Sequence, residues 1–509
     1  MQSFKPCHFM LTNYSPEEST GTRLSTPRRP EWKLAALSEH LAPLMIANGL
    51  KVDLQPGAHD DPLIGDVTGN PTKAYKVRGA LASADAAKRE GQDLLVTASA
   101  GNHGAGIAYA ARLLGLRARV YVPTTAPGAK VQILEGFGAE VIKVGSSFDE
   151  SLARARQDED VRSSRGKFVH PFDDLIVAAG QGTIGVELLE SLSATLATKP
   201  VDIVRIFLPI GGGGLMAGVA SVMKTRWQTT HPKLEIVGVI DESAPASLLA
   251  TLFGRPVRVA PNTIADGTRV ALVGETFLSV SHLIDKLILV PHDAIVSAMR
   301  SYESHTGTRL EPSGALALAG EQAARNERLF GTRAVTTSVA LVTGRNFDVV
   351  TYQDTLKAAP RLNLDSHLRQ GFDVLIEERP GELLRFLRTV RDYNIASLTY
   401  KQRPGTRAGH LRVEFELETS AVTSAERLLG RSFPGSRRLQ PGEHMLYEVG
   451  RPVAHKFKED LITLTDEPGS FLRCVERLSH EGSFGSVGFL FYQKPAHDGA
   501  FAQVVIGRH

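Results

Sequence analysis

The sequence predicts a large α/β domain built on parallel sheets, followed by two small α+β modules. Short apolar strands alternate with helices from about residue 32 to residue 350. This order covers a parallel sheet with helices on both faces, because each strand needs a crossover before the next parallel strand. The alternation stops after Val350, and a segment around Pro380-Gly381 recurs around Pro468-Gly469, 88 positions later (468 − 380). A unit that recurs at this spacing indicates two modules of ordinary size.

Length and composition exclude several classes of protein. A chain of 509 residues is too long for one ordinary core, so two or three domains are expected. The net charge of +3 gives no basis for binding nucleic acid or an anionic membrane, and the sequence lacks the run of 18 apolar residues that predicts a transmembrane helix. Cys7 and Cys474 are the only cysteines, so neither a disulfide framework nor a cysteine metal cluster is expected.

The cysteine count suits a reducing compartment, and we expect a cytoplasmic protein. Residues 1–30 are polar and lack the apolar core of a secretory signal, although an organellar presequence stays open. We interpret this segment as a flexible arm.

The elements of the large domain follow from hydrophobic periodicity and from small-residue turns. Helices are expected at about 32–50, 77–89, 105–114, 130–136, 148–157, 183–196 and 215–225. Strands are expected at about 93–97, 117–123, 140–144, 167–169, 203–209 and 234–240. In such a fold, ligands bind at the carboxyl ends of the strands.

The domain boundaries are placed where the alternation stops and the repeat begins. The large domain takes residues 31–353, a connector takes 354–368, and the two modules take 369–455 and 456–509. Each module is expected to run strand, Pro-Gly turn, helix, strand, strand. The later strands are expected at 395–401, 411–417, 486–493 and 500–506.

Lys76 stands at the start of the expected helix 77–89 and is a candidate for covalent chemistry. An uncharged lysine amine forms a Schiff base with a carbonyl compound. Both Arg78 and the N-terminus of the helix disfavour the charged ammonium. A surface lysine would give the same local pattern, so Lys76 is singled out only together with two further stretches.

The first of these stretches is the glycine run Gly211–Gly214, which lies between an apolar strand and an apolar helix. Backbone N–H groups exposed by glycines, together with a helix N-terminus, form a cradle for an anion such as phosphate. No Lys-Ser/Thr follows, so the run is not a nucleotide-hydrolysing P-loop, and its spacing fails the dinucleotide-binding pattern. A flexible linker is the alternative interpretation.

The second stretch is the turn Ser99–His103 at the end of a strand. Its polar groups could bind a carboxylate or a ring hydroxyl, or Ser99 or Asn102 could simply cap the next helix. Thr343 also ends a strand, and its hydroxyl could reach a heteroaromatic nitrogen or belong to an ordinary turn. We interpret His170 as structural, because it has no partner at metal-ligand spacing, and Glu311 as the start of a capped helix.

Together these residues resemble the fold-type II pyridoxal-phosphate enzymes and, within them, the biosynthetic threonine dehydratases (threonine ammonia-lyases). The matching segments run in family order and are Ala74–Ala80, Ser99–His103, Gly136–Val141, His170–Asp173, Ala179–Thr183, Gly211–Leu215, Thr263–Gly267 and Glu311–Gly320. The resemblance implies a two-lobed catalytic domain like the tryptophan synthase β subunit. The C-terminal repeat resembles the paired ACT-like regulatory modules of the feedback-inhibited enzyme.

The resemblance also implies a role for each matching residue. Lys76 would carry pyridoxal 5′-phosphate and then act as the base for the substrate α-proton, with Tyr75 against the cofactor ring. Asn102 would contact the ring hydroxyl, and Thr343 would face the ring nitrogen. The phosphate would be held by Gly211, Gly212, Gly213, Gly214 and Leu215. The substrate carboxylate would be bound by Ser99, Ala100, Gly101, Asn102 and His103.

Two of these positions bear on the reaction type. The neutral hydroxyl of Thr343 cannot keep the ring nitrogen protonated, which favours β-elimination over racemisation or transamination. Related serine racemases place a second serine at the position of Ala100, so alanine there favours a dehydratase. The chain departs from the common family pattern at Lys73, Tyr75 and Arg345. Leu248 replaces a carboxylate of metal-binding relatives, so no metal is expected.

The expected function is therefore deamination of L-threonine to 2-oxobutanoate and ammonia, the first step of isoleucine synthesis. Isoleucine or valine would act as effectors, and a homotetramer is implied by the resemblance. β-Elimination or β-replacement on serine or another amino acid is a second possibility. A non-catalytic amino-acid sensor is a third, although the presence of Lys76 and of the glycine run argues against it.

Overall fold

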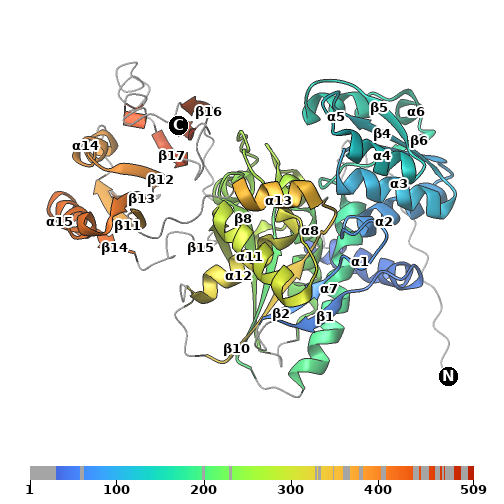
Figure 1. Ribbon diagram of the computed structural model, residues 1–509, viewed down its shortest axis with the longest axis horizontal. Helices are drawn as coiled ribbons and strands as arrows, with labels where there is room; N and C mark the ends of the chain where they lie inside the picture. Colours follow the sequence, from blue (N-terminus) through green and yellow to red (C-terminus); the bar gives the residue numbers. More distant parts are fainter. Residues whose placement is uncertain are drawn as a thin grey trace, which may run out of the picture.

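The computed structural model contains three sheets (Figure 1). It describes residues 30–57, 62–197, 201–228, 232–326, 330, 334–347, 349–358, 367–377, 382–402, 408–439, 446–448, 458–464, 471–472, 475, 487–493 and 502–508. The expected flexible arm and both expected Pro-Gly turns lie outside these residues, apart from Pro30.

The large lobe is built on a seven-stranded sheet of order β1-β2-β10-β7-β8-β9-β15. Strands β2, β10, β7, β8 and β9 run parallel, and β1 and β15 add antiparallel edges. The strands are β1 (Asp53–Pro56), β2 (Leu63–Asp66), β7 (Ile203–Pro209), β8 (Lys233–Asp241), β9 (Lys286–Val290), β10 (Thr336–Val342) and β15 (Leu446–Glu448). The inner strands are almost wholly buried, as expected for a parallel sheet between two layers of helices.

Helices pack on both faces of this sheet, and two apolar clusters fill the two layers. These helices are α1 (Pro30–Ala47), α7 (Leu175–Leu196), α8 (Gly214–Arg226), α9 (Ala246–Phe253), α10 (Glu275–Leu278), α11 (His292–Thr306), α12 (Pro312–Asn326) and α13 (Val349–Ala358). Two short 3₁₀ turns, η2 (Asp266–Thr268) and η3 (Ser281–Leu283), lie in the connections.

The small lobe holds a four-stranded parallel sheet of order β5-β4-β3-β6 and stands apart at the upper right of Figure 1. Its strands are β3 (Leu94–Ala98), β4 (Arg117–Val122), β5 (Glu140–Lys143) and β6 (Gly166–Phe168). Its helices are α2 (Val77–Arg89), α3 (Asn102–Leu114), α4 (Gly128–Gly136), α5 (Phe148–Arg156) and α6 (Glu159–Arg162). The two lobes confirm the predicted α/β architecture, with every expected strand and helix of the large domain present.

Helix α7 begins earlier than the sequence predicts. It starts at Leu175, not at Thr183, because the carboxylate of Asp174 accepts hydrogen bonds from the N–H groups of Ile176 and Val177 and caps the first turn. Among the described helices, α7 is the one with the length and composition of a membrane span. However, 67% of its most apolar window is buried inside the protein, and its apolar surface is used in packing against α1, α2 and α8.

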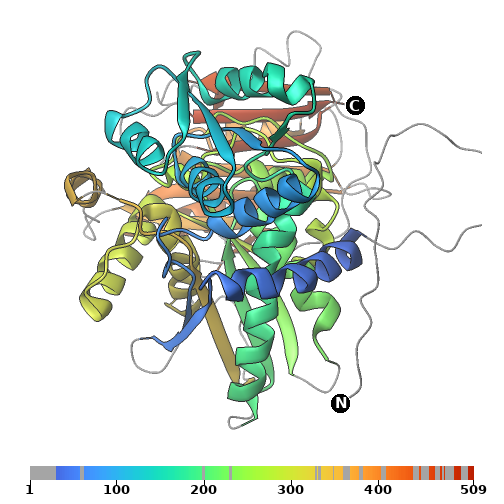
Figure 2. The ribbon, with the colours of Figure 1, turned by 90° about the vertical axis from the view of Figure 1, so that its right-hand side faces the viewer.

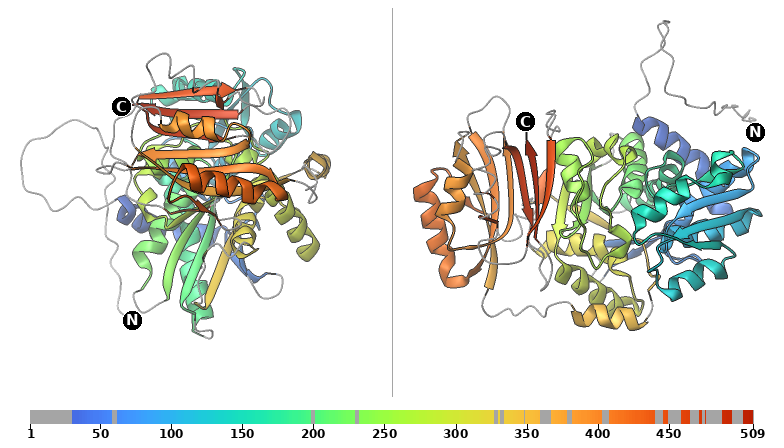
Figure 3. Two further views of the ribbon diagram at one scale, coloured as in Figure 1. Left: turned by 90° about the vertical axis from the view of Figure 1, so that its left-hand side faces the viewer. Right: turned by 90° about the horizontal axis from the view of Figure 1, so that it is seen from above.

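The C-terminal region forms one antiparallel sheet of seven strands, ordered β14-β11-β13-β12-β17-β18-β16. The strands are β11 (His367–Glu377), β12 (Asn394–Gln402), β13 (Ala408–Glu418), β14 (Arg437–Arg438), β16 (Lys458–Leu464), β17 (Val487–Gln493) and β18 (Ala502–Arg508). Helices α14 (Glu382–Thr389) and α15 (Val422–Ser432), with the 3₁₀ turn η4 (Thr419–Ala421), belong to the first module. Figure 3 shows this sheet beyond the large lobe, with α14 and α15 on its outer face, and in Figure 2 the sheet lies behind the two lobes.

The later strands of both modules are confirmed within three residues at each end. Strand β12 pairs with β17 and joins the modules in one sheet. Two features differ from the predicted boundaries. Helix α13 continues to Ala358, so the first residues assigned to the connector are helical. Strand β15, assigned to the first module, instead pairs with β9 of the large lobe, where a sheet edge offers free backbone groups.

Candidate active site

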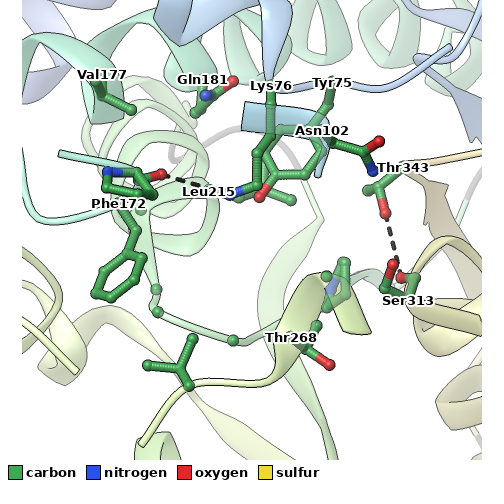
Figure 4. Close-up of a pocket in the computed structure, with 18 of the residues that line it drawn as sticks. Tyr75, Lys76, Asn102, Phe172, Val177, Gln181, Leu215, Thr268, Ser313 and Thr343 are labelled. Carbon is green, nitrogen blue, oxygen red and sulfur yellow. Dashed lines mark hydrogen bonds between the residues drawn. The ribbon is translucent and has the colours of Figure 1, made fainter. Parts of the chain in front are cut away.

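A cavity of about 600 Å³, including its open mouth, collects most of the predicted site residues (Figure 4). Its lining includes Tyr75, Lys76, Asn102, Gly211, Gly212, Gly213, Gly214, Leu215 and Thr343. These residues come from the starts of α2, α3 and α8 and from the end of β10. They therefore meet where strands end and helices begin, as the topology of a parallel sheet dictates.

Lys76 occupies the N-cap position of α2, and its side chain enters the cavity. Its Nζ donates a long hydrogen bond of 3.4 Å to the carbonyl oxygen of Pro171 and lies 5.3 Å from the centre of the Tyr75 ring. An amine with one distant acceptor is held loosely. Such an amine can turn toward a ligand in the cavity.

Arg78 anchors the helix that carries Lys76. Its guanidinium is 1% exposed and donates to Glu187 at 2.5 Å and to Thr183 Oγ1 at 2.9 Å. The same Glu187 carboxylate accepts from the backbone N–H of Val52. A buried ion pair of this kind compensates the charge of Arg78, so α2 is fixed to α7 and to the segment before β1.

The glycine turn excludes side chains at each of its four positions. A Cβ would lie 2.7 Å from Thr268 Cα at Gly211 and 2.8 Å from the Phe172 carbonyl oxygen at Gly214. At Gly212 and Gly213 it would overlap the rings of Phe172 and Phe277. Gly213 also has φ of +86°, which other residues rarely adopt. The turn thus brings bare backbone and the N-terminus of α8 to the cavity, a cradle that fits the phosphate of pyridoxal phosphate.

Asn102 is held from both sides by other side chains. Its Nδ2 donates to Glu311 Oε1 at 2.7 Å, and its Oδ1 accepts from Asn346 Nδ2 at 3.1 Å. Ser313 Oγ donates to the same Glu311 oxygen at 2.9 Å. These bonds fix the orientation of the Asn102 amide at the cavity wall.

Glu311 was missed as a functional residue by the sequence analysis, which treated it as a helix start. It lines the cavity and is 8% exposed, and burial raises its pKa to about 7. A carboxyl group that titrates near neutral pH in a cavity is a typical functional group. The available signal was a carboxylate placed just before an apolar helix.

Thr343 lies at the end of β10, as predicted. Its Oγ1 donates to the Ser313 carbonyl oxygen at 3.3 Å, and its own carbonyl oxygen accepts from Tyr75 N–H at 3.0 Å. An isolated β-bridge joins Ala74 to Gly344 beside it. The chain before Lys76 is therefore tied to the end of β10, which positions Tyr75 and Thr343 in one wall.

The turn Ser99–His103 contributes only Asn102 to the cavity lining. Ser99 Oγ accepts from Gly101 N–H at 3.2 Å, so it shapes the turn before α3. The His103 ring is 2% exposed and 3.5 Å from the Val169 carbonyl oxygen, and burial lowers its pKa well below the usual value. Binding of a carboxylate by Ser99, Ala100, Gly101 and His103 stays a prediction.

Replacement of Glu311 by glutamine should remove a pH dependence of stability. The folded state holds the Glu311 proton more tightly than the unfolded state, whose pKa is near 4.5. The unfolding free energy therefore falls as pH rises from about 4.5 to 7, by about 3 kcal/mol in total. Urea unfolding of the cofactor-free protein at pH 5 and pH 8 measures this difference.

In Glu311→Gln, which has no proton to release, the difference between the two pH values should shrink by about that amount. Glu303→Gln is a suitable control, because Glu303 is a partly exposed carboxylate whose pKa is lowered, not raised, by hydrogen bonds from Tyr352 and Arg309. An equal pH response in wild type and Glu311→Gln would contradict the raised pKa.

Comparison with known proteins gives a consistent result. A family model described as "Pyridoxal-phosphate dependent enzyme" matches residues 66–344. An L-threonine ammonia-lyase of Geobacter sulfurreducens is 36% identical over 358 residues, which are 68% of this chain and 83% of that protein. The biosynthetic L-threonine dehydratase of Escherichia coli is 29% identical over 446 residues, or 84% of this chain and 81% of that protein.

The alignment with the Escherichia coli protein covers 84% of this chain, which is more than residues 1–353 make up. It therefore extends into the C-terminal region. Among solved structures, threonine deaminase isoform 2 from Solanum lycopersicum superposes with a TM-score of 0.56 and is 30% identical. That match covers 66% of this chain and 90% of the other.

Proposed function

The chain belongs to the family of pyridoxal-phosphate-dependent enzymes, and we propose that it deaminates L-threonine to 2-oxobutanoate and ammonia, the first step of isoleucine biosynthesis. The observation that carries the proposal is the meeting of the Lys76 amine, the glycine cradle and Thr343 in one cavity. The threonine dehydratases and threonine deaminase that the chain resembles support threonine as the substrate.

When bound, pyridoxal phosphate supplies an electron sink for the bond that breaks at the substrate Cα. Lys76 would anchor this group, and its free amine would then take the α-proton of the substrate. The glycine turn and the N-terminus of α8 would hold the phosphate. The Asn102 amide, which Glu311 and Asn346 orient, would contact a ring substituent.

Thr343 limits the chemistry available to the site. Its hydroxyl makes a long hydrogen bond of 3.3 Å to Ser313 O. It would turn to donate to an unprotonated ring nitrogen, to which it supplies no charge. A neutral hydrogen-bond partner at the ring nitrogen makes the cofactor a weaker electron sink. This favours loss of the substrate β-hydroxyl over reprotonation at Cα. The described lining residues offer one amine, that of Lys76, for the proton. The predicted opposite-face position is Ala100 rather than a serine.

The proposal is tested by supplying the purified full-length protein with pyridoxal phosphate and measuring 2-oxo acid release from threonine and from serine. Threonine is expected to give the higher kcat/KM. Release from serine alone would replace threonine by serine as the substrate. A visible Schiff-base absorbance without release from either amino acid would leave a binding protein rather than a lyase.

Regulation by branched-chain amino acids is part of the same proposal. The C-terminal sheet has its own apolar core, which shares no residue with the cores of the two lobes. Strand β15 connects this region to the large lobe, with Leu446 opposite Ile288. A separately folded module tied to a catalytic sheet is suited to an effector-binding role, and a homotetramer is proposed from the family resemblance.

A chain ending at Ala358 should keep threonine deamination within about threefold and lose its response to isoleucine, because the lobes retain their cores. Initial rates with and without isoleucine or valine provide the measurement, and the full-length protein is the control. If the full-length enzyme ignores both amino acids, the regulatory proposal is wrong even though catalysis is intact.

A further inference from the structure

The side chain of Gln181 is buried at the cavity without a partner for its amide oxygen. It lies on α7, is 2% exposed and contributes to the cavity lining. Within the described residues, its Oε1 has no hydrogen-bond donor. A buried polar atom left unpaired costs free energy, and in a native protein such an atom generally has a function or a ligand.

Gln181 lies against the helix face that carries Lys76. A Cβ at Gly79 would overlap Gln181 Nε2, so glycine at this position admits the amide. Gly79 follows Lys76 by three positions, and residues three apart share one face of a helix. Figure 4 shows that both Gln181 and Lys76 enter the cavity from its upper side.

The Lys76 amine can donate more hydrogen bonds than the described residues accept from it. An ammonium group carries three N–H donors, but among the described residues Lys76 Nζ has a single acceptor, Pro171 O at 3.4 Å. The lysine side chain has four rotatable bonds and can redirect its amine within the cavity. The unpaired Gln181 amide oxygen and the Lys76 amine therefore both belong to side chains that line the cavity.

We propose that Gln181 is a positioning residue: its amide oxygen accepts a hydrogen bond from the Lys76 amine when this amine is free of the cofactor and turns away from its long contact with Pro171 O. The amine is released when substrate takes its place, and it must then stay at the substrate Cα to move the proton. The Gln181 carbonyl favours the protonated amine and restricts its direction. This inference rests on the proposed attachment of the cofactor to Lys76.

Other titratable groups also surround Lys76 and must be held constant in a test. They are His103 and His170, which interact electrostatically with Lys76, and Glu311 in the cavity wall. The nearby charge of Arg78 is compensated by Glu187. Substitution of Gln181 leaves these groups in place, so a change in the behaviour of Lys76 reports on Gln181.

The test follows acetylation of Lys76 by acetic anhydride in the full-length protein after removal of the cofactor, with the Lys76 peptide quantified by mass spectrometry. Gln181→Met keeps the side-chain volume but removes the acceptor. The pH midpoint of labelling should fall, so that Lys76 reacts about three- to tenfold faster at neutral pH. Gln181→Glu, which places a carboxylate there, should raise the midpoint.

Ser221→Ala is the matched control. Ser221 is also buried with an unpartnered side-chain oxygen, but it lies on α8 outside the cavity lining. Its replacement should leave the labelling midpoint unchanged. An unchanged midpoint in both Gln181 variants, each shown to be folded by circular dichroism, would overturn the proposal, and if one variant does not fold the other decides.

The cofactor-loaded enzyme gives a second readout. Gln181→Met should lower kcat for threonine about tenfold with a smaller change in KM, because Gln181 acts after the substrate has displaced Lys76. A rise in KM alone would assign Gln181 to substrate binding instead. Since labelling needs no substrate, a shifted midpoint in a protein inactive on threonine would retain the role of Gln181 and reject the proposed function.

Discussion

Replacement of Lys76 by alanine is expected to lower threonine deamination by at least about a thousandfold, because one side chain supplies both the attachment and the base. Among the described residues that line the cavity, no other side chain carries an amine. The measurement is kcat/KM for threonine together with the visible absorbance of the cofactor-loaded protein. The absorbance typical of a Schiff base should disappear in Lys76→Ala.

Lys76→Arg provides the stricter comparison. Arginine keeps the positive charge next to the Tyr75 ring, but its guanidinium forms no such Schiff base and does not deprotonate in proteins. The two variants should therefore be equally inactive, while both still bind the cofactor phosphate through the glycine turn. Substantial activity in either variant would place the covalent chemistry on another residue.

Much of this cavity could be predicted from sequence, for a physical reason. Lys76, Gly211–Gly214 and Thr343 each lie at the start of a helix or the end of a strand, and in a parallel α/β fold such ends meet at one edge of the sheet. Local patterns therefore determined the location of these residues without any long-range information. The resemblance to pyridoxal-phosphate enzymes then supplied their separate roles.

Residues whose function depends on distant partners could not be predicted. Glu311 acquires its raised pKa from burial, and Asn346 contacts Asn102 across 244 positions of chain. Both are ordinary polar residues in a local window. Gln181 is similar, because an unpaired amide is recognised only when every neighbour in space is known.

The start of α7 was missed because glycines at Gly180 and Gly182 lower helix propensity. Packing reverses this preference. A Cβ at Gly182 would lie 3.0 Å from Gly218 O, and one at Gly218 would overlap Ala178 O, so small residues let α7 and α8 approach closely. Strand β15 was missed for a different reason, since three residues carry too little periodicity to be recognised.

Gly213→Ala is expected to abolish cofactor binding at ordinary concentrations, with an increase in the dissociation constant of at least about a hundredfold. Two costs combine at this position. Alanine is strained at φ of +86°, and its Cβ would overlap the Phe277 ring, which is buried in the core with 1% of its surface exposed. The strain and the overlap can both be relieved only if the glycine turn shifts, and the N–H groups of the phosphate cradle then move with it.

Gly91→Ala introduces backbone strain without steric overlap. Comparison with Gly213→Ala therefore shows whether overlap at the phosphate cradle adds to the loss of cofactor binding. Gly91 has φ of +76° at the end of α2, but a Cβ there meets nothing within 4 Å. This variant should lose about 1 kcal/mol of unfolding free energy from backbone strain and bind pyridoxal phosphate normally. Gly213→Ala should lose about 3 kcal/mol, since overpacking adds to strain. The affinity of both variants for pyridoxal phosphate is measured by absorbance titration. Equal affinities would mean that the phosphate is held elsewhere, because a turn displaced from Phe277 no longer presents the same N–H groups.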